Sequence, residues 1–249
     1  MAKQCAICGT EKMNLFQSQK LKDGNAICTK TCKKLGLKYF NYQFASLEKT
    51  LAHHKQVERG KKLWEHFFVP RLNAKKLKNF KHIFIAEDIG LLAVREKRSF
   101  FIFWNKSEHY CVYRLADLAA YRLDKDVQSN VSASGKRSSS KTFYVRFLFE
   151  EQVEALSIFR VKLSKGKCRQ LIKYLDGLFG IVTKEKGVFS DLKDSWQYMM
   201  SFKEEGKSMS SVNMEEVQID MMKKSGNYRE GDKTKWVEVA DTALKEFPG

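Results

Sequence analysis

Short hydrophobic runs rich in β-branched and aromatic residues follow one another through the middle of the chain, between residues 82 and 180. Turn-forming groups such as Asp88-Ile89-Gly90 separate these runs, which is the pattern of antiparallel β-strands. The pattern predicts strands over 82–86, 91–97, 99–105, 109–113, 119–125, 142–150 and 156–164. An amphipathic helix follows, with Cys168, Leu171, Ile172, Leu175 and Leu178 on one face. We therefore expect a β domain that one helix closes.

A helical pattern comes before the strands. Over 41–69 the hydrophobic residues recur at roughly helical spacing, and Pro70 is expected to end the run. The predicted apolar face consists of Phe44, Leu47, Leu51, Val57, Trp64, Phe67 and Phe68, and the basic outer face of Lys49, Lys55, Arg59, Lys61 and Lys62. His53, His54 and His66 lie on the same helix without the His-Glu-x-x-His spacing of a metal site, so we expect solvated or packed imidazoles.

The end of the chain is polar and slightly acidic. Helices are predicted over 190–200, 213–224 and 232–247. The methionine and tryptophan side chains of this tail suit either an adaptable binding surface or docking onto the rest of the chain. With 43% hydrophobic residues the chain can bury a core. Together the patterns predict an α+β protein in four parts, 1–40, 41–81, 82–182 and 183–249.

Four of the six cysteines lie close together at the start of the chain. Cys5 and Cys8 are separated by two residues, Cys28 and Cys32 by three, and nineteen residues lie between the pairs. This is the spacing of a zinc site, because four thiolates must converge on one tetrahedral ion from two short turns. Disulfides are disfavoured because the sequence shows no export signal, so we expect a reducing, cytoplasmic location. A redox dithiol is the remaining alternative.

The residues around the cysteines favour a compact metal unit. Gly9 follows the second ligand, where a tight turn needs unusual backbone angles. Asp23-Gly24 at the centre of a turn predicts a hairpin whose strands lie within 16–21 and 25–28. After Cys28 the chain is expected to be helical, which would place Cys28 and Cys32 one turn apart on one helix face.

These motifs carry a resemblance. "CAICG", "KLKDG" and the closing "IC…CKKLG" resemble a small bacterial treble-clef zinc-finger domain of unknown function with four cysteine ligands, which usually precedes a bacterial PH-like domain. That family usually closes with a Cys-x2-Cys pair, whereas this chain has Cys28-x3-Cys32. More loosely, "VYRLADLAAYRL" (112–123) resembles two strands and a turn of bacterial PH-like domains. The resemblance implies one structural Zn2+ and a PH-like antiparallel β-sandwich or barrel with a capping helix.

The net charge of +17 is concentrated at the front of the chain. Residues 1–82 contain 18 Lys or Arg against 5 Asp or Glu, which indicates either a solvated lysine-rich surface or an anionic partner. Candidate nucleic-acid or anion contacts are Lys33, Lys34, Lys38, Arg59, Lys61 and Lys62, with Phe16, Tyr39, Phe40 and Tyr42 as candidate stacking residues. Lys136 and Arg137, in the serine-rich loop 128–141, are further candidate phosphate contacts, although a solvated loop without a ligand fits this composition better.

The sequence contains no recognisable catalytic motif. It has no phosphate-binding glycine loop, no Gly-x-Ser-x-Gly elbow and no long apolar span. Cys111 and Cys168 lie in apolar runs, where cysteine acts as a small hydrophobic residue. Four thiolates would occupy all four coordination positions of a tetrahedral zinc ion, so the ion is expected to be structural. We expect a non-enzymatic adaptor that acts through protein contacts; the alternatives are nucleic-acid binding by the basic front and attachment to an anionic membrane surface.

Overall fold

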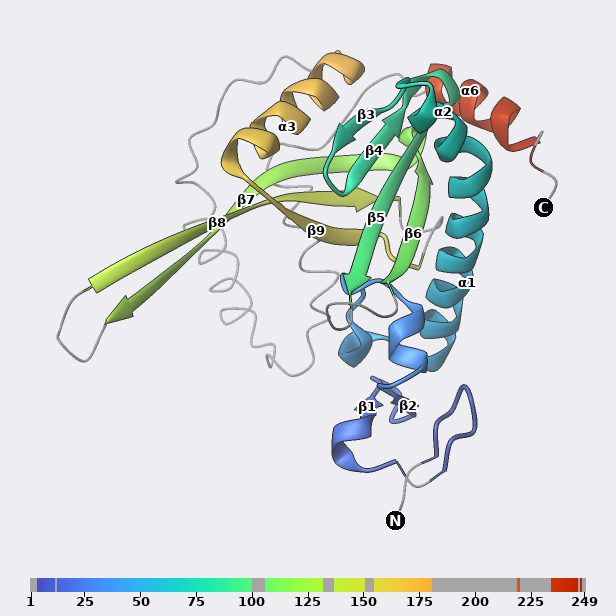
Figure 1. Cartoon of the computed structure of the whole chain (residues 1–249), viewed down its shortest axis with the longest axis vertical. Coiled ribbons are helices and arrows are strands. Elements are labelled where there is room, and N and C mark those ends of the chain that lie inside the picture. The colour runs from blue at the N-terminus through green and yellow to red at the C-terminus, as the bar shows by residue number, and fades with distance from the viewer. Residues whose placement is uncertain are drawn as a thin grey trace, which may run out of the picture. The chain divides into compact units, whose positions relative to one another are not determined.

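The computed structural model describes residues 4–11, 13–99, 106–131, 137–150, 155–180, 219, 234–245 and 247 (Figure 1). They form two compact units. The first unit lies within Met1–Asp117, Glu150–Ser157 and Lys233–Gly249, and the second lies within Leu118–Phe149 and Ile158–Asp232. The architecture is mixed α/β with antiparallel sheets and an N-terminal cysteine cluster, which confirms the predicted class. The tail helix predicted over 190–200, the helix predicted over 213–224 apart from Ile219, most of the strand predicted over 99–105, and Lys136 lie outside the described residues. The four-part division stays a prediction.

Short elements build the start of the first unit. They are η1 (Leu15–Gln17), β1 (Ser18–Lys20), β2 (Ala26–Cys28), η2 (Cys32–Leu35) and η3 (Tyr42–Phe44). β1 and β2 pair in antiparallel register, with Ser18 opposite Cys28. Gly24 adopts a φ of 85° in the turn between them, a value that glycine tolerates without steric cost. The predicted hairpin is therefore confirmed.

A long helical segment follows, and it continues further than predicted. It consists of α1 (Leu47–Leu63), a π-helical turn η4 (Trp64–Phe68) and α2 (Val69–Asn73). The Ser46 hydroxyl caps α1 by accepting the Lys49 N–H at 3.1 Å. The prediction that Pro70 ends the helix was wrong, because Pro70 lies in the first turn of α2, where its missing N–H and fixed φ do no harm.

The buried face of α1 is partly polar. Its buried residues are Thr50, His53, Gln56, Val57, Gly60 and Leu63. Two residues of the predicted apolar face, Phe44 and Leu51, are instead 51% and 41% exposed. The helix was predicted correctly, but its buried face was not. The polar residues Thr50, His53 and Gln56 are buried at positions that hydrophobic residues usually fill.

A four-stranded sheet completes the first unit, in the order β3 (Lys78–Phe80), β4 (Ile83–Ala86), β5 (Leu91–Ser99), β6 (Lys106–Arg114). β3 was not predicted. The turn η5 (Glu87–Ile89) and the left-handed Gly90 join β4 to β5, as expected. The last helix, α6 (Thr234–Lys245), confirms the helix predicted over 232–247, and its Ala240 and Ala243 enter the same core as Trp64, Phe68 and Phe84.

The second unit contains a three-stranded antiparallel sheet and a helix. The strands β7 (Leu118–Val131), β8 (Arg137–Phe149) and β9 (Ile158–Leu163) pair in chain order, and the short turn η6 (Leu115–Asp117) leads into β7. α3 (Lys165–Phe179) buries Cys168, Leu171 and Leu175, so its predicted apolar face is confirmed. None of the helices described in the structure combines the length and apolar character that a membrane crossing requires.

Candidate metal centre

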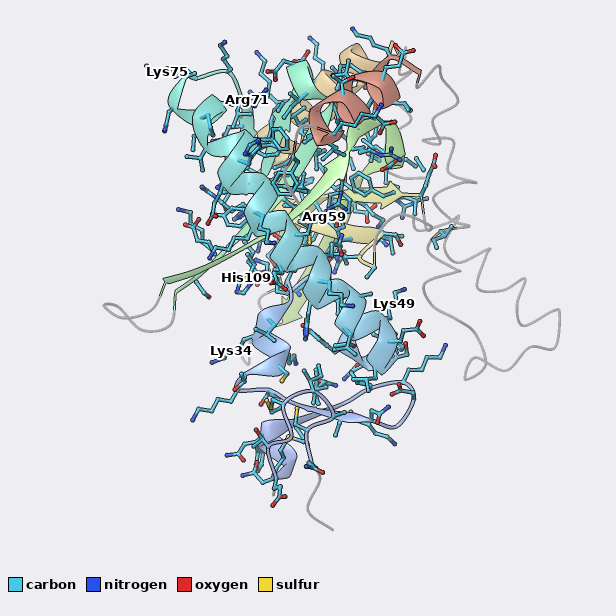
Figure 2. The ribbon with its side chains drawn as sticks, turned by 90° about the vertical axis from the view of Figure 1, so that its right-hand side faces the viewer. Lys34, Lys49, Arg59, Arg71, Lys75 and His109 are labelled. Carbon is cyan, nitrogen blue, oxygen red and sulfur yellow. The ribbon has the colours of Figure 1, made fainter. Side chains whose placement is uncertain are left out.

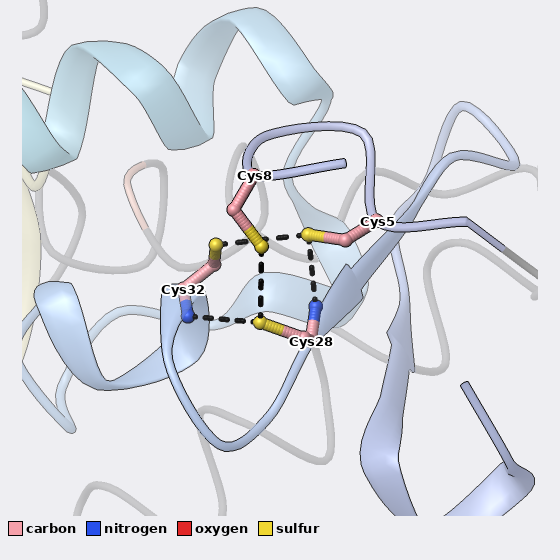
Figure 3. Close-up of side chains that lie close together, drawn as sticks. All are labelled: Cys5, Cys8, Cys28 and Cys32. Atoms are coloured by element: carbon pink, nitrogen blue, oxygen red, sulfur yellow. Dashed lines mark hydrogen bonds between the residues drawn. The ribbon is translucent and has the colours of Figure 1, made fainter. Parts of the chain in front are cut away.

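The four N-terminal cysteines converge on one point. Their sulfur atoms all lie within 4.8 Å of one another, in a group that could hold a metal ion (Figure 3). The Sγ atoms of Cys5 and Cys32 are 3.6 Å apart, as are those of Cys8 and Cys28. Cys5, Cys28 and Cys32 are buried, whereas Cys8 is exposed. The cluster therefore closes over three ligands and meets solvent at the fourth.

Each pair of cysteines is held by a different local structure. Cys5 and Cys8 lie on a tight turn that Gly9 ends with a φ of 69° and in which the Gly9 N–H donates to the Cys5 carbonyl. Cys28 ends strand β2, and Cys32 begins the 3-10 helix η2. The prediction that Cys28 and Cys32 share one helix face was therefore wrong. A turn over 29–31 joins the strand to the short helix and brings the two thiols together instead.

Backbone amides face the sulfur atoms. The Cys28 N–H donates to the Cys5 Sγ at 3.2 Å, and the Cys32 N–H donates to the Cys28 Sγ at 3.3 Å (Figure 3). Such bonds stabilise negative charge on thiolate sulfur, the form in which cysteine binds a metal. The backbone N–H groups of Cys28 and Cys32 are thus placed to stabilise thiolate ligands.

The spacing of the sulfur atoms fits a tetrahedral site. Zn–S bonds of about 2.3 Å place the sulfurs of a tetrahedron about 3.8 Å apart. Two of the separations are 3.6 Å and none exceeds 4.8 Å, which is compatible with that value. Because the set consists only of thiols, it suits a thiophilic ion and not a hard cation such as Mg2+.

The pKa values of the thiols differ with their surroundings. The Thr10 hydroxyl, 3.1 Å from the Cys8 sulfur, lowers the pKa of Cys8 to about 6. Burial raises the pKa of Cys32 far above that of an ordinary thiol. Burial alone would also raise the pKa of Cys28, but the N–H of Cys32 and that of Thr31 outweigh it and lower this pKa. Cys8 is therefore the ligand most readily available as a thiolate.

The hairpin between the two cysteine pairs is tied to the start of α1. Asp23 at the tip of the β1–β2 turn accepts the Leu47 N–H at 2.7 Å, and the Lys22 N–H donates to the Ala45 carbonyl at 2.9 Å. The Leu47 amide lowers the pKa of Asp23 below its usual range. The Asp-Gly turn was predicted from the sequence, but its second role as an acceptor at a helix N-terminus was not, because only the folded chain brings Asp23 to Leu47.

A buried polar network makes the next connection. His53 is fully buried; its Nε2 accepts the Leu37 N–H at 3.0 Å, so Nδ1 carries the proton and donates to the Gln56 Oε1 at 3.1 Å. The same Gln56 oxygen accepts the Leu156 N–H at 3.1 Å. The His53 ring also stacks on Phe40 at 4.2 Å. His53 thus connects the chain after η2 to α1, and it is a packed imidazole, one of the two states expected for it.

The predicted basic contacts lie at separate places. Lys34, Lys38, Arg59, Lys61 and Lys62 are exposed, and Figure 2 shows Lys34 at the cysteine end and Arg59 on α1. Lys33 is partly buried, with Nζ 3.1 Å from the Gln19 Oε1, and Lys61 lies 3.9 Å from Glu65. Arg59 also lines a cavity of about 160 Å³ with Leu63 and Arg114. Arg59, Lys61 and Lys62 lie on the outer face of α1, as predicted, whereas Lys33, Lys34 and Lys38 precede α1 in the chain.

Two of the four predicted stacking aromatics are buried. Phe40 and Tyr42 are buried at 6% and 4% exposure, and burial raises the pKa of Tyr39. The prediction was wrong for Phe40 and Tyr42, because they pack around His53 and the carbonyl of Lys33. Phe16, in contrast, is 94% exposed.

Comparisons with known proteins agree with the cysteine cluster. Residues 3–57 match a protein-family model described as a domain of unknown function (DUF4428). The match includes all four cysteines and the part of α1 that carries His53 and Gln56. No curated protein and no solved structure matches the chain.

Stability should fall as the pH is lowered below the ordinary histidine range. Burial lowers the pKa of His54, and burial together with nearby Lys81 lowers the pKa of His82. The unfolded chain then binds protons more readily than the folded one, so stability is complete above the unfolded histidine pKa of about 6.5 and is lost below it. Urea unfolding of wild type and of His54→Asn is compared at about pH 7.5 and about pH 5.5. The free energy of unfolding should fall less between these two pH values for the variant than for wild type. An equal loss in both proteins would contradict the assignment.

Proposed function

We propose that the chain is a non-enzymatic zinc protein that binds other proteins, with a treble-clef N-terminal unit as its binding surface and a PH-like β domain after it in the chain. The observation that carries this proposal is the all-cysteine cluster, in which four thiols within 4.8 Å match the ligand set of structural Zn2+. Four thiolates fill a tetrahedral ion and leave no position for a water or a substrate. The ion then supplies folding free energy and not chemistry.

The order of elements supports the two fold assignments. A cysteine turn, a hairpin and a short helix that begins at the last ligand are the parts of a treble clef, shortened here to the 3-10 helix η2. Four antiparallel strands, three further antiparallel strands and then α3 follow the order of a PH-like domain. Both are scaffolds that carry binding surfaces, and function on such scaffolds resides in the exposed side chains.

Exposed hydrophobic side chains mark the binding surface on the first unit. Eight large hydrophobic residues of the described part are exposed, and four of them, Phe16, Leu35, Phe44 and Leu51, lie within 3–57. Phe16 is the most exposed at 94%, although the backbone beneath it is fixed by the Thr29 hydroxyl that donates to its carbonyl at 3.3 Å. An exposed aromatic side chain on a hydrogen-bonded backbone is suited to be an interface anchor. We assign Phe16 that role.

Affinity capture with a matched control tests this proposal. The zinc-loaded full chain, its Phe16→Ala variant and a Val127→Ala control are immobilised, and proteins retained from an extract are identified and then titrated as purified proteins. We expect a retained protein that binds wild type and Val127→Ala with equal affinity. Phe16→Ala should bind it about 30-fold more weakly, because loss of an anchor residue costs about 2 kcal/mol of binding free energy. The 94% exposure of Phe16 means that folding should not change. Equal binding by Phe16→Ala, or turnover of a substrate by the purified chain, would contradict the proposal.

Nucleic-acid binding by the basic front is the second candidate. Its support is the set of basic side chains that Figure 2 labels on the first unit, including the exposed Lys34, Arg59 and Lys75 and the half-buried Lys49. Phosphate neutralisation by such side chains predicts binding that weakens steeply with salt. The Lys61→Gln/Lys62→Gln variant described below measures this contribution.

A further inference from the structure

The strands β7 and β8 extend far beyond their neighbour in the second unit. β9 pairs with β8 only from Phe143 to Leu148, whereas β7 and β8 remain paired as far as Val131 and Arg137. Residues 125–131 and 137–142 therefore form a two-stranded ribbon, which we call the arm and which Figure 1 shows running past β9 and α3. At about 3.3 Å per residue the arm is about 20 Å long. Nothing in the described part of the second unit pairs with its outer edges.

The register gives the two faces of the arm different charges. One face carries the cross-strand pairs Val127–Lys141 and Ser129–Ser139, with Lys125 opposite Phe143 at its base. Lys165 adds a further ammonium group to this end, 5.8 Å from the Phe143 ring centroid. No carboxylate lies on this face among the described side chains. The other face holds the one carboxylate of the arm, Asp126, which pairs with Arg160 at 2.9 Å.

The exposed surface of the arm is hydrophilic and rich in hydroxyl groups. Ser129, Ser138, Ser139 and Ser140 are exposed, as is Lys141. Val127, at 50% exposure, is the one large hydrophobic side chain among the exposed residues of the arm that the structure describes. Serine hydroxyls and lysine ammonium groups are the side chains that commonly contact DNA phosphates. A surface of this kind does not offer the apolar pockets with which strand-binding domains select a peptide.

We propose that the arm binds double-stranded DNA by entering the major groove. That groove is about 12 Å wide and admits a two-stranded β-ribbon, whereas the major groove of A-form RNA is too narrow for side chains to reach the bases. Lys125 and Lys141 lie on the face without carboxylates and contact the phosphates. The serines hydrogen-bond to phosphate oxygens, and Val127 makes an apolar contact. This site shares no residue with the basic outer face of α1 or with the cysteine cluster.

Fluorescence anisotropy with the zinc-loaded full chain tests the proposal. The probe is a labelled 24-base-pair duplex, titrated at about 50 mM and about 200 mM salt, a range over which phosphate contacts dominate the change in affinity. The arm variant Lys125→Gln/Lys141→Gln is compared with Lys61→Gln/Lys62→Gln, which removes the same charge from α1. We expect the arm variant to bind about tenfold more weakly at low salt and the slope of log K against log salt to become shallower by about two, with the α1 variant weakening binding less than the arm variant does.

A second variant removes the arm and keeps the sheet. Residues 128–140 are replaced by Asn-Gly, a two-residue turn that closes the existing Val127–Lys141 pair. If this variant unfolds at the same temperature as wild type but does not bind DNA, the result supports the proposal. Three outcomes would overturn it: no duplex binding at low salt, weakening by the α1 variant and not by the arm variants, or equal arm-dependent binding of a polyglutamate peptide or of vesicles containing phosphatidylserine.

Discussion

Replacing Cys28 with serine is expected to abolish metal binding and to unfold the hairpin at the start of the chain. Cys28 supplies one thiolate, and its sulfur also accepts the Cys32 N–H that positions the last ligand. The segment is held by short elements of three or four residues, which cannot build a core of their own. Structural Zn2+ contributes about 10–16 kcal/mol in small zinc-finger peptides, so losing one of four ligands removes most of the folding free energy of this segment.

Metal content and amide hydrogen exchange measure this effect. Wild type should bind one Zn2+, and Co2+ in its place should give the absorption of a tetrahedral thiolate site. The amides of Ala6 and Leu21, which donate to the Ala26 and Asn25 carbonyls, should be protected in the metal-bound chain and exchange rapidly in Cys28→Ser or after chelation. Cys111→Ala is the control, since Cys111 is fully buried elsewhere and its loss should leave one ion bound. Undiminished protection in the metal-free chain would contradict a structural ion.

The cysteine cluster could be predicted from the sequence because its information is local. Spacing identified the two pairs, and Asp23-Gly24 and Gly9 identified the two turns. The backbone between Cys28 and Cys32 was predicted wrongly, because three intervening residues are equally compatible with a helical turn and with the strand end and 3-10 helix that the structure contains. Two thiols can approach one ion from either conformation, so the spacing alone does not select one.

The contacts that tie the metal segment to α1 could not be predicted in the same way. Asp23 and Leu47 are 24 residues apart, and Gln56 and Leu156 are 100 apart, so these bonds depend on the fold of the whole unit. The sequence left His53 open between a solvated and a packed imidazole, and nothing in it marked Gln56 as buried. They are buried because the backbone amides of Leu37 and Leu156 need acceptors inside the protein, and a hydrophobic residue at either position could not provide one. The polar residues therefore obscured the true buried face of α1.

Replacing Gly60 with alanine is expected to separate α1 from β6 and to destabilise the first unit by about 1–3 kcal/mol or more. A Cβ at Gly60 would lie 2.2 Å from the Tyr110 carbonyl oxygen and 2.8 Å from its carbon. Both are backbone atoms of β6, so no side chain can rotate away. The helix would have to move, and with it Trp64, whose ring stacks on that of Tyr110 at 4.6 Å. Alanine favours a helix over glycine by about 1 kcal/mol, which is too little to offset this loss of packing.

The matched control is Gly177→Ala on α3. A Cβ at Gly177 meets no atom within 4 Å, so the same substitution there gains helix propensity without a clash. Urea unfolding followed by circular dichroism should therefore show opposite shifts, with a lower midpoint for Gly60→Ala and a slightly higher one for Gly177→Ala, by about 0.4–1 kcal/mol. Because α1 also receives the Asp23 and His53 contacts from the metal segment, the Gly60 variant should in addition exchange the Leu37 amide faster. An unchanged midpoint for Gly60→Ala would contradict the close approach of the Gly60 backbone to the Tyr110 carbonyl.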